Sequence, residues 1–378
     1  MDDDVMDDQQ RVSTLELFFD LVFVFTITQL TSVLVLHPNL RGLAQVALML
    51  GVIWWMYSGY AWLTNAVPPD RPERQAFLLA AMGAYLVLAL SIPHAFTGTG
   101  LTFGLAYFAI VLIHAGLFAR STEATVVQAV TGLAKFNVSS AALLVVGGAL
   151  GGTAEYVLWT AAFLLEWITP PLTGISDFRI QAAHFVERHG LVVIVAIGES
   201  VVAIGIGAAG LPVNAELVLV AVLGLMLSAC LWWSYFAGEE SRAERALAAA
   251  PRLRQPWLAV YAYGYWHLPI LLGIIAIAFA LKKSTGHAFD ELDLAPALGL
   301  GGGVAAFLLG DVLFRRTLGL GTGPHRAAAG VLALATIPLG LAASAFLQLA
   351  ALVALFAGAL LLERQASSSR YRPIVSPA

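Results

Sequence analysis

The sequence predicts an all-α integral membrane protein of about twelve transmembrane helices, arranged as two parallel six-helix repeats. Three observations predict this class. The chain is 59% hydrophobic and 12% charged, with a mean hydropathy of +0.82, whereas soluble domains carry about 25% charged residues. Apolar runs of about 18–24 residues recur from end to end, and each can cross a ~30 Å hydrocarbon core. Lys and Arg are also divided unequally between alternate loops.

Helix-breaking residues separate the apolar runs, for example Pro38-Asn39, Pro68-Pro69-Asp70 and the segment 210–214. The last two runs have no polar loop between them. One helix over both would be about 55 Å long at 1.5 Å per residue, too long for one crossing, so we expect a hairpin near Ser344. The expected spans are 14–36, 43–65, 74–96, 101–119, 126–149, 154–174, 186–209, 215–237, 256–281, 295–314, 326–343 and 345–362.

The positions of Lys and Arg predict the orientation. With the N-terminus inside, sixteen of the twenty fall on the cytoplasmic side, while Arg41, Lys282 and Lys283 fall on the opposite side. Positive charge is retained on the cytoplasmic side of membrane proteins, so we expect an inner-membrane protein with both termini cytoplasmic. Residues 1–12 are acidic, unlike a secretory signal, and are expected to form a solvated tail. Residues 363–378 are expected to form a second cytoplasmic tail.

The two halves of the chain, 13–174 and 175–362, look like copies. A shift of 170 residues places 21–29 on 191–199 and Trp62 on Trp232. Six spans per half give both copies the same direction in the membrane, which predicts parallel repeats. Binding sites in such proteins lie between the repeats, so the first and seventh helices are expected at that interface.

Several classes of function are excluded by what the sequence lacks. Cys230 is the only cysteine, which excludes an intramolecular disulfide and a cysteine-rich metal site. The histidines and carboxylates have no zinc-site spacing, and we find neither a phosphate-binding glycine loop nor a nucleophile with its base. We therefore expect no enzyme, no metal and no cofactor. The net charge of −4 does not suggest nucleic acid. The expected partners are the lipid bilayer and a small solute, proton or cation, with a homodimer left open.

Glu199 lies in the middle of the apolar segment 191–205. A carboxylate at that depth costs roughly 2.5–3.5 kcal/mol on insertion scales, so it is usually functional or paired. Lys135 and Asn137 interrupt the fifth span, and Glu166 interrupts the sixth. An intramembrane lysine needs a carboxylate partner, and both Glu166 and Glu199 are candidates.

Two further polar residues complete this candidate site. Gln29 is the repeat partner of Glu199, and His267 lies well inside the ninth span beside Pro269. We expect Glu199 to be the central group, coupled to Lys135 and His267. The alternative is a buried, hydrogen-bonded Glu199 that only holds helices together.

A second group of charges lies at the inner ends of the first and seventh spans. Glu16 and Asp20 are four residues apart and share a helix face, as do His184 and Arg188. Two carboxylates at this spacing repel each other unless a cation, a proton or an arginine lies between them, and Arg188 is the natural partner. Glu187 lies beside them. These residues predict either a structural salt bridge between two helix ends or a cytoplasmic gate.

Two motifs carry a resemblance to a known family. Residues 16–24 with Gln29-Leu30, and residues 184–191 leading to 198–200, resemble the bacterial low-temperature-requirement A family over nearly the whole chain. The family name records a growth phenotype and implies no reaction. Phe19-Asp20 is also similar to the Phe-Ser-Asp signature of a potassium channel family with six-span repeats, which implies a pore-lining first helix. Here Phe19 replaces the serine, and Gly190 aligns with Asp20 in the second copy.

Three functions follow from these patterns. The first is a secondary transporter of a small solute or ion, including a proton-coupled one, with a mid-membrane site around Glu199. The second is a cation channel lined by the first and seventh helices. The third is a membrane scaffold or stress sensor needed for growth at low temperature.

Overall fold

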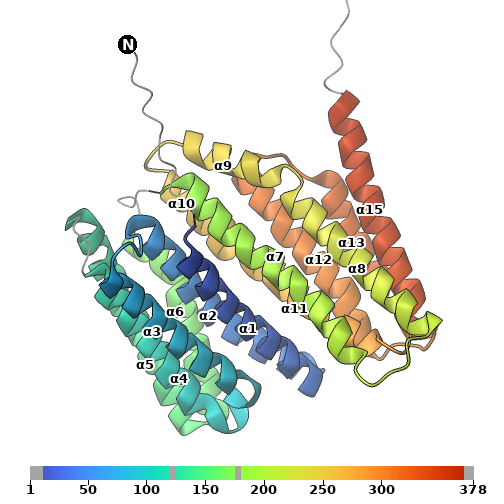
Figure 1. The fold of residues 1–378 in the computed structure, drawn as a ribbon, viewed down its shortest axis with the longest axis horizontal. Coiled ribbons are helices and arrows are strands. Elements are labelled where there is room, and N and C mark those ends of the chain that lie inside the picture. The colour runs from blue at the N-terminus through green and yellow to red at the C-terminus, as the bar shows by residue number, and fades with distance from the viewer. Residues whose placement is uncertain (1–11, 120–123, 175–179, 370–378) are drawn as a thin grey trace, which may run out of the picture. The chain divides into compact units, whose positions relative to one another are not determined.

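The computed structural model describes residues 12–119, 124–174 and 180–369, and all regular secondary structure in these ranges is helical (Figure 1). The long helices of the first part are α1 (Thr14–Leu36), α2 (Leu40–Ala66), α3 (Pro72–Ser91), α4 (Gly100–Phe118), α5 (Ala124–Leu150), α6 (Gly152–Thr173), α7 (Ala182–Gly207) and α8 (Ala215–Phe236). They are followed by α9 (Glu239–Ala249), α10 (Gln255–Ala259), α11 (His267–Ser284), α12 (Leu294–Thr317), α13 (Pro324–Ala335), α14 (Ile337–Ala342) and α15 (Ala345–Ser369). The chain is thus all-α, as predicted.

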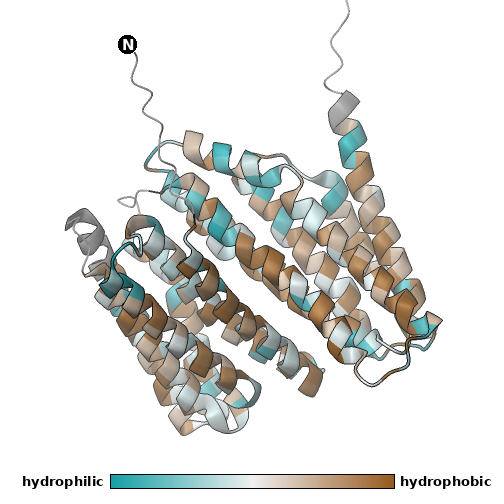
Figure 2. Ribbon diagram, viewed as in Figure 1, coloured by the Kyte–Doolittle hydropathy of each residue, from teal (hydrophilic) through white to brown (hydrophobic). Residues whose placement is uncertain are grey.

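Ten helical segments of the described residues are long and apolar enough to cross a membrane. Figure 2 shows hydrophobic residues along most of the length of these helices. The protein is therefore a multi-pass membrane protein. The predicted count of twelve differs from ten at two places. The candidate segment Pro72–Phe118 contains both α3 and α4, and α6 is not among the ten. The count of twelve and the repeat arrangement stay predictions.

The hairpin expected near Ser344 is present. α14 ends at Ala342, α15 begins at Ala345, and the helical conformation is lost at Ala343. The Ser344 hydroxyl accepts a hydrogen bond from the Leu347 backbone N–H at 3.2 Å, which caps the start of α15. The two segments form separate candidate spans that pack against each other.

The chain divides into two compact units whose boundaries differ from the expected halves 13–174 and 175–362. Unit 1 comprises residues 1–196 and 240–268, and unit 2 comprises residues 197–239 and 269–378. Helix α7 contributes to both. Unit 1 also contains α9, a short helix where the sequence predicted only a loop. Ala243 and Leu247, one turn apart on α9, are fully buried, so its apolar face packs into the protein.

Within unit 1, α4 packs along α5, α5 along α6, and α1 against α2 and α3. Glycine makes the first of these contacts close. A Cβ on Gly104 of α4 would lie 2.7 Å from the Val145 Cα of α5, so a larger residue there would push the helices apart. Within unit 2, α12 packs along α13, and α8 along α15.

The predicted ninth span is not a regular α-helix. Residues Val260–Tyr265 form a π-helical turn between α10 and α11, and the Trp266 N–H bonds to the Tyr261 carbonyl five residues back. The Gly264 carbonyl in this turn accepts a hydrogen bond from the Trp54 indole of α2 at 2.8 Å. Turns of this kind are frequent at functional sites.

Candidate functional site

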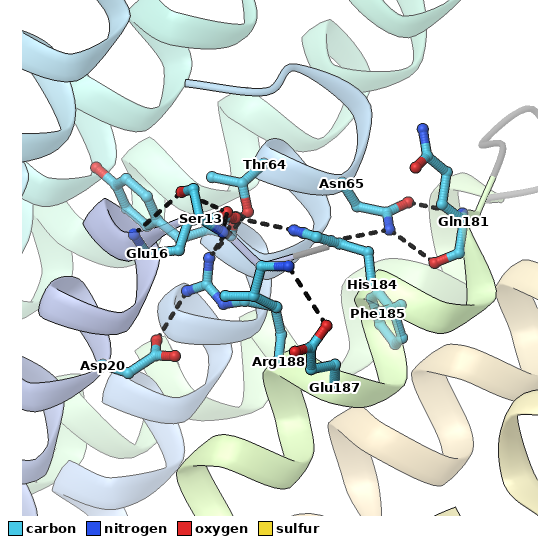
Figure 3. A network of polar contacts seen from close by, with 12 residues as sticks. Ser13, Glu16, Asp20, Thr64, Asn65, Gln181, His184, Phe185, Glu187 and Arg188 are labelled. Carbon is cyan, nitrogen blue, oxygen red and sulfur yellow. Dashed lines mark hydrogen bonds and ion pairs between the residues drawn. The ribbon is translucent and has the colours of Figure 1, made fainter. Parts of the chain in front are cut away.

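A buried cluster of charged side chains joins α1, α2 and α7 in unit 1 (Figure 3). Arg188 of α7 lies at its centre with only 1% of its surface exposed. Its Nη1 donates to Glu16 Oε1 at 2.8 Å, and its Nη2 donates to Asp20 Oδ1 at 2.8 Å. Thr64 of α2 accepts a third bond from Nη1 at 3.0 Å. The structure therefore brings together the three charges that the sequence analysis placed at the ends of two helices.

Helical spacing explains how each element presents its part of this cluster. Glu16 and Asp20 are four residues apart on α1, and His184 and Arg188 are four apart on α7. Residues at this spacing project from the same face of a helix. Two helices that meet along these faces place the two carboxylates of α1 opposite the imidazole and the guanidinium of α7.

Glu16 has two functions in the cluster. Its Oε2 accepts hydrogen bonds from the Ser13 backbone N–H at 2.9 Å and from the Ser13 hydroxyl at 2.8 Å, which forms a capping box at the start of α1. Its Oε1 faces Arg188 and His184 Nε2, at 2.8 and 3.0 Å. The same side chain thus begins the first helix and ties it to the seventh.

The hydrogen-bond partners of His184 favour the neutral tautomer with the proton on Nε2, and Asn65 is the residue that decides this. The Asn65 amide is oriented by Gln181, because Oδ1 accepts from the Gln181 N–H at 3.0 Å and Nδ2 donates to the Gln181 carbonyl at 2.9 Å. Nδ2 also lies 3.3 Å from His184 Nδ1. An amide NH₂ only donates, so Nδ1 must accept. The proton therefore resides on Nε2, which donates to Glu16.

With His184 in this tautomer, the cluster holds two carboxylates, one guanidinium and one neutral imidazole. Asp20 carries the negative charge that no cation in the cluster balances. Its Oδ1 accepts from Arg188 and from the Tyr57 hydroxyl at 2.8 Å, but its buried Oδ2 has no hydrogen-bond partner among the described residues. A buried carboxylate oxygen without a donor is costly. Asp20 is therefore the position in the cluster where an added proton would remove the excess charge.

Aromatic rings and two more histidines continue from the cluster. Tyr57 stacks on Trp54 with 5.3 Å between ring centroids, and Trp54 stacks on His267 at 5.9 Å. His189 lies edge-on to both Trp54 and His267. His267, a predicted site residue, thus lies in unit 1, fully buried, with Nδ1 2.9 Å from the Ala262 carbonyl. Trp54 and Tyr57 are contacts that the sequence analysis did not identify.

Lys135 does not pair with Glu166, one of the two carboxylates that the sequence analysis gave as its candidate partners. Lys135 of α5 is exposed on the protein surface, with its Nζ 5.1 Å from the Phe136 ring centroid. Glu166 is fully buried, and its Oε1 accepts from the hydroxyls of Tyr107 and Ser140, each at 2.6 Å. The alternative of a Lys135–Glu166 ion pair is therefore wrong. The fifth helix places its charge outward. Two hydroxyl groups bond to Glu166 Oε1, while its buried Oε2 has no hydrogen-bond partner among the described residues.

The other predicted residues occupy distinct positions. Asn137 is buried and accepts from the Trp55 indole at 3.1 Å. Glu187 is half-buried and accepts from the Val12 N–H at 3.3 Å, at the margin of the cluster. Gln29 is half-buried on α1, and Glu199 is buried on α7 within unit 2. The role of Glu199 stays a prediction.

Unit 2 contains a second buried charged cluster that the sequence analysis missed. Arg326 of α13 donates to both oxygens of Asp311 on α12 at 3.0 and 2.8 Å, and to Glu363 of α15 at 2.7 Å. Arg315 bridges Glu363 at 2.8 Å and Glu239 at 2.6 Å. Asp311, an acidic residue inside a predicted span, was the sequence feature that could have revealed this cluster. Its partner Arg326 lies on another helix, and the sequence does not show that the two helices are neighbours.

The comparisons with known proteins agree with this picture of the chain. The family model of the bacterial low temperature requirement A protein (LtrA) matches residues 11–361. A protein of Rhizobium meliloti (strain 1021), described as uncharacterized protein RA0937, is 30% identical over 329 residues. That similarity covers 82% of the chain and 78% of the relative. The family match includes Glu16, Asp20, His184 and Arg188 of the first charged cluster, whereas Glu363 of the second lies beyond its end.

Proposed function

Because this chain belongs to the bacterial low temperature requirement A family and carries many membrane-crossing helices, we propose that it is a secondary transporter that moves a small solute together with protons. The observation that carries the proposal is the cluster of Glu16, Asp20, His184 and Arg188, which holds more carboxylates than cations in a buried position. Ionisable groups inside membrane proteins mark proton and ion pathways.

The excess charge gives the cluster two states. With Asp20 ionised, Arg188 is shared between two carboxylates, and α1 and α7 are held together. A proton on Asp20 would weaken its bond to Arg188 and leave Glu16 as the main anchor. In this proposal the cluster is the cytoplasmic gate, and the proton on Asp20 determines how firmly the two helices are joined.

Glu199 is the second group in the proposal. It lies eleven residues beyond Arg188 on α7, which is roughly 16 Å of helical rise, and returns to within about 20° of the same helix face. Both residues are buried. We assign Glu199 the mid-membrane proton or substrate site and Arg188 the gate on the same helix.

The proposed topology is twelve crossings in two parallel six-helix repeats, in the cell (inner) membrane, with both termini cytoplasmic. The segment Pro72–Phe118 supports the higher count, because its 47 residues would measure roughly 70 Å as one helix. Its two parts, α3 and α4, pack against each other, as two antiparallel crossings do. The distribution of Lys and Arg supports the orientation.

Reconstitution in liposomes that contain a pH-sensitive dye tests the function. A proton gradient is imposed, and panels of neutral and charged small solutes are added outside. Saturable proton movement that depends on a solute is the expected result for the wild type. A rapid ion leak that follows the gradient without saturation would indicate a channel, and no movement would indicate a scaffold or sensor. Either result overturns the proposal.

Two variants link the readout to the site. Asp20→Asn and Glu199→Gln preserve shape while removing the titrating group, and we expect both to insert normally and to lose solute-coupled proton movement. Asp70→Asn is the matched control, because Asp70 pairs with the neighbouring Arg74 on the same helix end and its side chain is 60% exposed. Wild-type coupling in both test variants would exclude these carboxylates from proton transport.

A further inference from the structure

Unit 1 contains an aromatic pocket that no part of the charged cluster occupies. It lies between α2, α4, α5, α6 and the π-helical turn at Val260–Tyr265, and its cavity volume is about 80 Å³. About 10–15 Å³ of such space holds one water, so this pocket has room for an organic molecule. Its walls include four indole side chains, those of Trp54, Trp55, Trp62 and Trp167.

Two buried polar side chains line this pocket. His114 of α4 and Ser58 of α2 are 6% and 7% exposed. Neither His114 Nε2 nor the Ser58 hydroxyl makes a hydrogen bond of good geometry among the described residues, and the only polar neighbour of the His114 ring among them is the Gly59 backbone. Buried polar groups are almost always hydrogen-bonded. Two such groups at one pocket therefore indicate that a molecule with its own polar group completes them.

Glycine keeps one of these groups accessible. Gly59 lies beside His114, and a Cβ at this position would be 3.2 Å from Nε2. The side chain of any other residue would crowd this nitrogen and reduce the pocket. The absence of a side chain at Gly59 thus leaves the polar edge of His114 open.

The lining also defines the charge of the ligand. None of the described residues that line the pocket is Asp, Glu, Lys or Arg. A charged ligand would lose its hydration without gaining a counter-charge, which is strongly unfavourable. A neutral ring would instead pack against the indoles, and its hydroxyl could both donate and accept, as His114 and Ser58 require.

We propose that this pocket, which we call the tryptophan pocket, is a binding site for a neutral aromatic compound that bears a hydroxyl group. The ring would lie among the four indoles, and the hydroxyl would bond to His114 Nε2 and Ser58 Oγ. This binding site goes beyond the proposed transport and exists whether or not the protein moves protons.

The tryptophan pocket is nevertheless connected to the charged cluster. Trp54 lines the pocket, its ring stacks on Tyr57 at an interplanar angle of 15°, and the Tyr57 hydroxyl donates to Asp20 at 2.8 Å. A ligand that shifts Trp54 would therefore move the donor to Asp20. If the protein is a transporter, this contact provides a route from ligand to proton.

Quenching of tryptophan fluorescence by para-bromophenol tests the site in purified, detergent-solubilised protein. Bromine quenches indoles in contact with it, and four of the nine tryptophans line the pocket. We expect saturable quenching in the wild type. Bromobenzene, which lacks the hydroxyl, should bind about tenfold more weakly, the value expected for the loss of one or two hydrogen bonds.

Variants distinguish the pocket from nonspecific partitioning. Ala115→Phe fills the pocket from α4 and should abolish the saturable phase, whereas Ala109→Phe, on the same helix outside the pocket, should retain it. If Ala115→Phe does not fold, Ala134→Phe fills the pocket from α5. The double variant Ser58→Ala with His114→Phe should bind both probes equally. Nonsaturable quenching, or equal quenching in the filled variant, would overturn the proposal. Because no proton transport is measured, this outcome is independent of the proposed function.

Discussion

Arg188 of α7 donates from Nη2 to Asp20 Oδ1 of α1 over 2.8 Å, and both side chains are almost completely buried. Residues 168 positions apart in the sequence are thereby joined. Since the same guanidinium also binds Glu16, one cation organises both carboxylates of α1. The consequences of this arrangement can be measured.

We expect Arg188→Gln to lower the free energy of unfolding by about 3–5 kcal/mol, because it leaves two buried carboxylates without their cation. Chemical denaturation in detergent micelles measures the change. Arg74→Gln is the control, since the Arg74–Asp70 pair is partly exposed and its loss should cost less than about 1 kcal/mol. Equal losses in the two variants would show that the Arg188 ion pairs do not stabilise the fold.

A second prediction concerns the coupling between Asp20 and Arg188. In a double-mutant cycle of Asp20→Asn with Arg188→Gln, the two effects on unfolding should be non-additive by about 0.5–3 kcal/mol, because the residues share one network. The same cycle with Asp70→Asn and Arg188→Gln serves as the control, and its effects should add. Additivity in the first cycle would mean that the residues do not interact.

The neutral tautomer of His184 is a third prediction. Solid-state NMR of protein with ¹⁵N-labelled histidine should show His184 with a protonated Nε2 and an unprotonated Nδ1, because Asn65 Nδ2 faces Nδ1. The His184→Gln variant assigns the signal. In Asn65→Asp, the carboxylate can accept a bond from Nδ1, so a doubly protonated ring is expected there. A doubly protonated ring in the wild type would contradict the proposed charge of the cluster.

The cluster of unit 2 gives a fourth prediction. Arg326→Gln should destabilise the protein by about 3–5 kcal/mol, because Asp311, which is 1% exposed, would lose the guanidinium nitrogen that donates to both of its oxygens. Arg316→Gln in the same unit is the matched control, since Arg316 is exposed and its Nε donates to the Thr322 backbone carbonyl. Thermal unfolding of the two variants measures the difference in stability. Equal stability of both would show that the Arg326–Asp311 ion pair does not stabilise unit 2.

The topology is a fifth prediction. In a Cys230→Ser background, Ala248→Cys on α9 should resist an impermeant maleimide in intact cells and react after permeabilisation, because α9 lies on the arginine-rich side. Lys283→Cys, on the opposite side, should react in intact cells. Labelling of position 248 in intact cells would invert the proposed orientation.

The sequence by itself determined that this is an all-α, multi-pass membrane protein, because long apolar runs can satisfy their backbone groups in lipid only as helices. It also identified the charged faces of α1 and α7. The four-residue spacing of Glu16 and Asp20, and of His184 and Arg188, is a local property of a helix and can be read directly from the chain.

Only the tertiary structure decided which groups meet across helices. The sequence offered Lys135 and Glu166 as partners, yet Lys135 is directed outward and Tyr107 and Ser140 bind Glu166. Nothing in the sequence predicts that Asn65 lies beside His184, so the tautomer of His184 could not be predicted from it. The rotation of each helix about its axis sets these contacts. Lipid and protein interior are both apolar, so hydropathy does not distinguish the face that meets a neighbouring helix from the face that meets the bilayer.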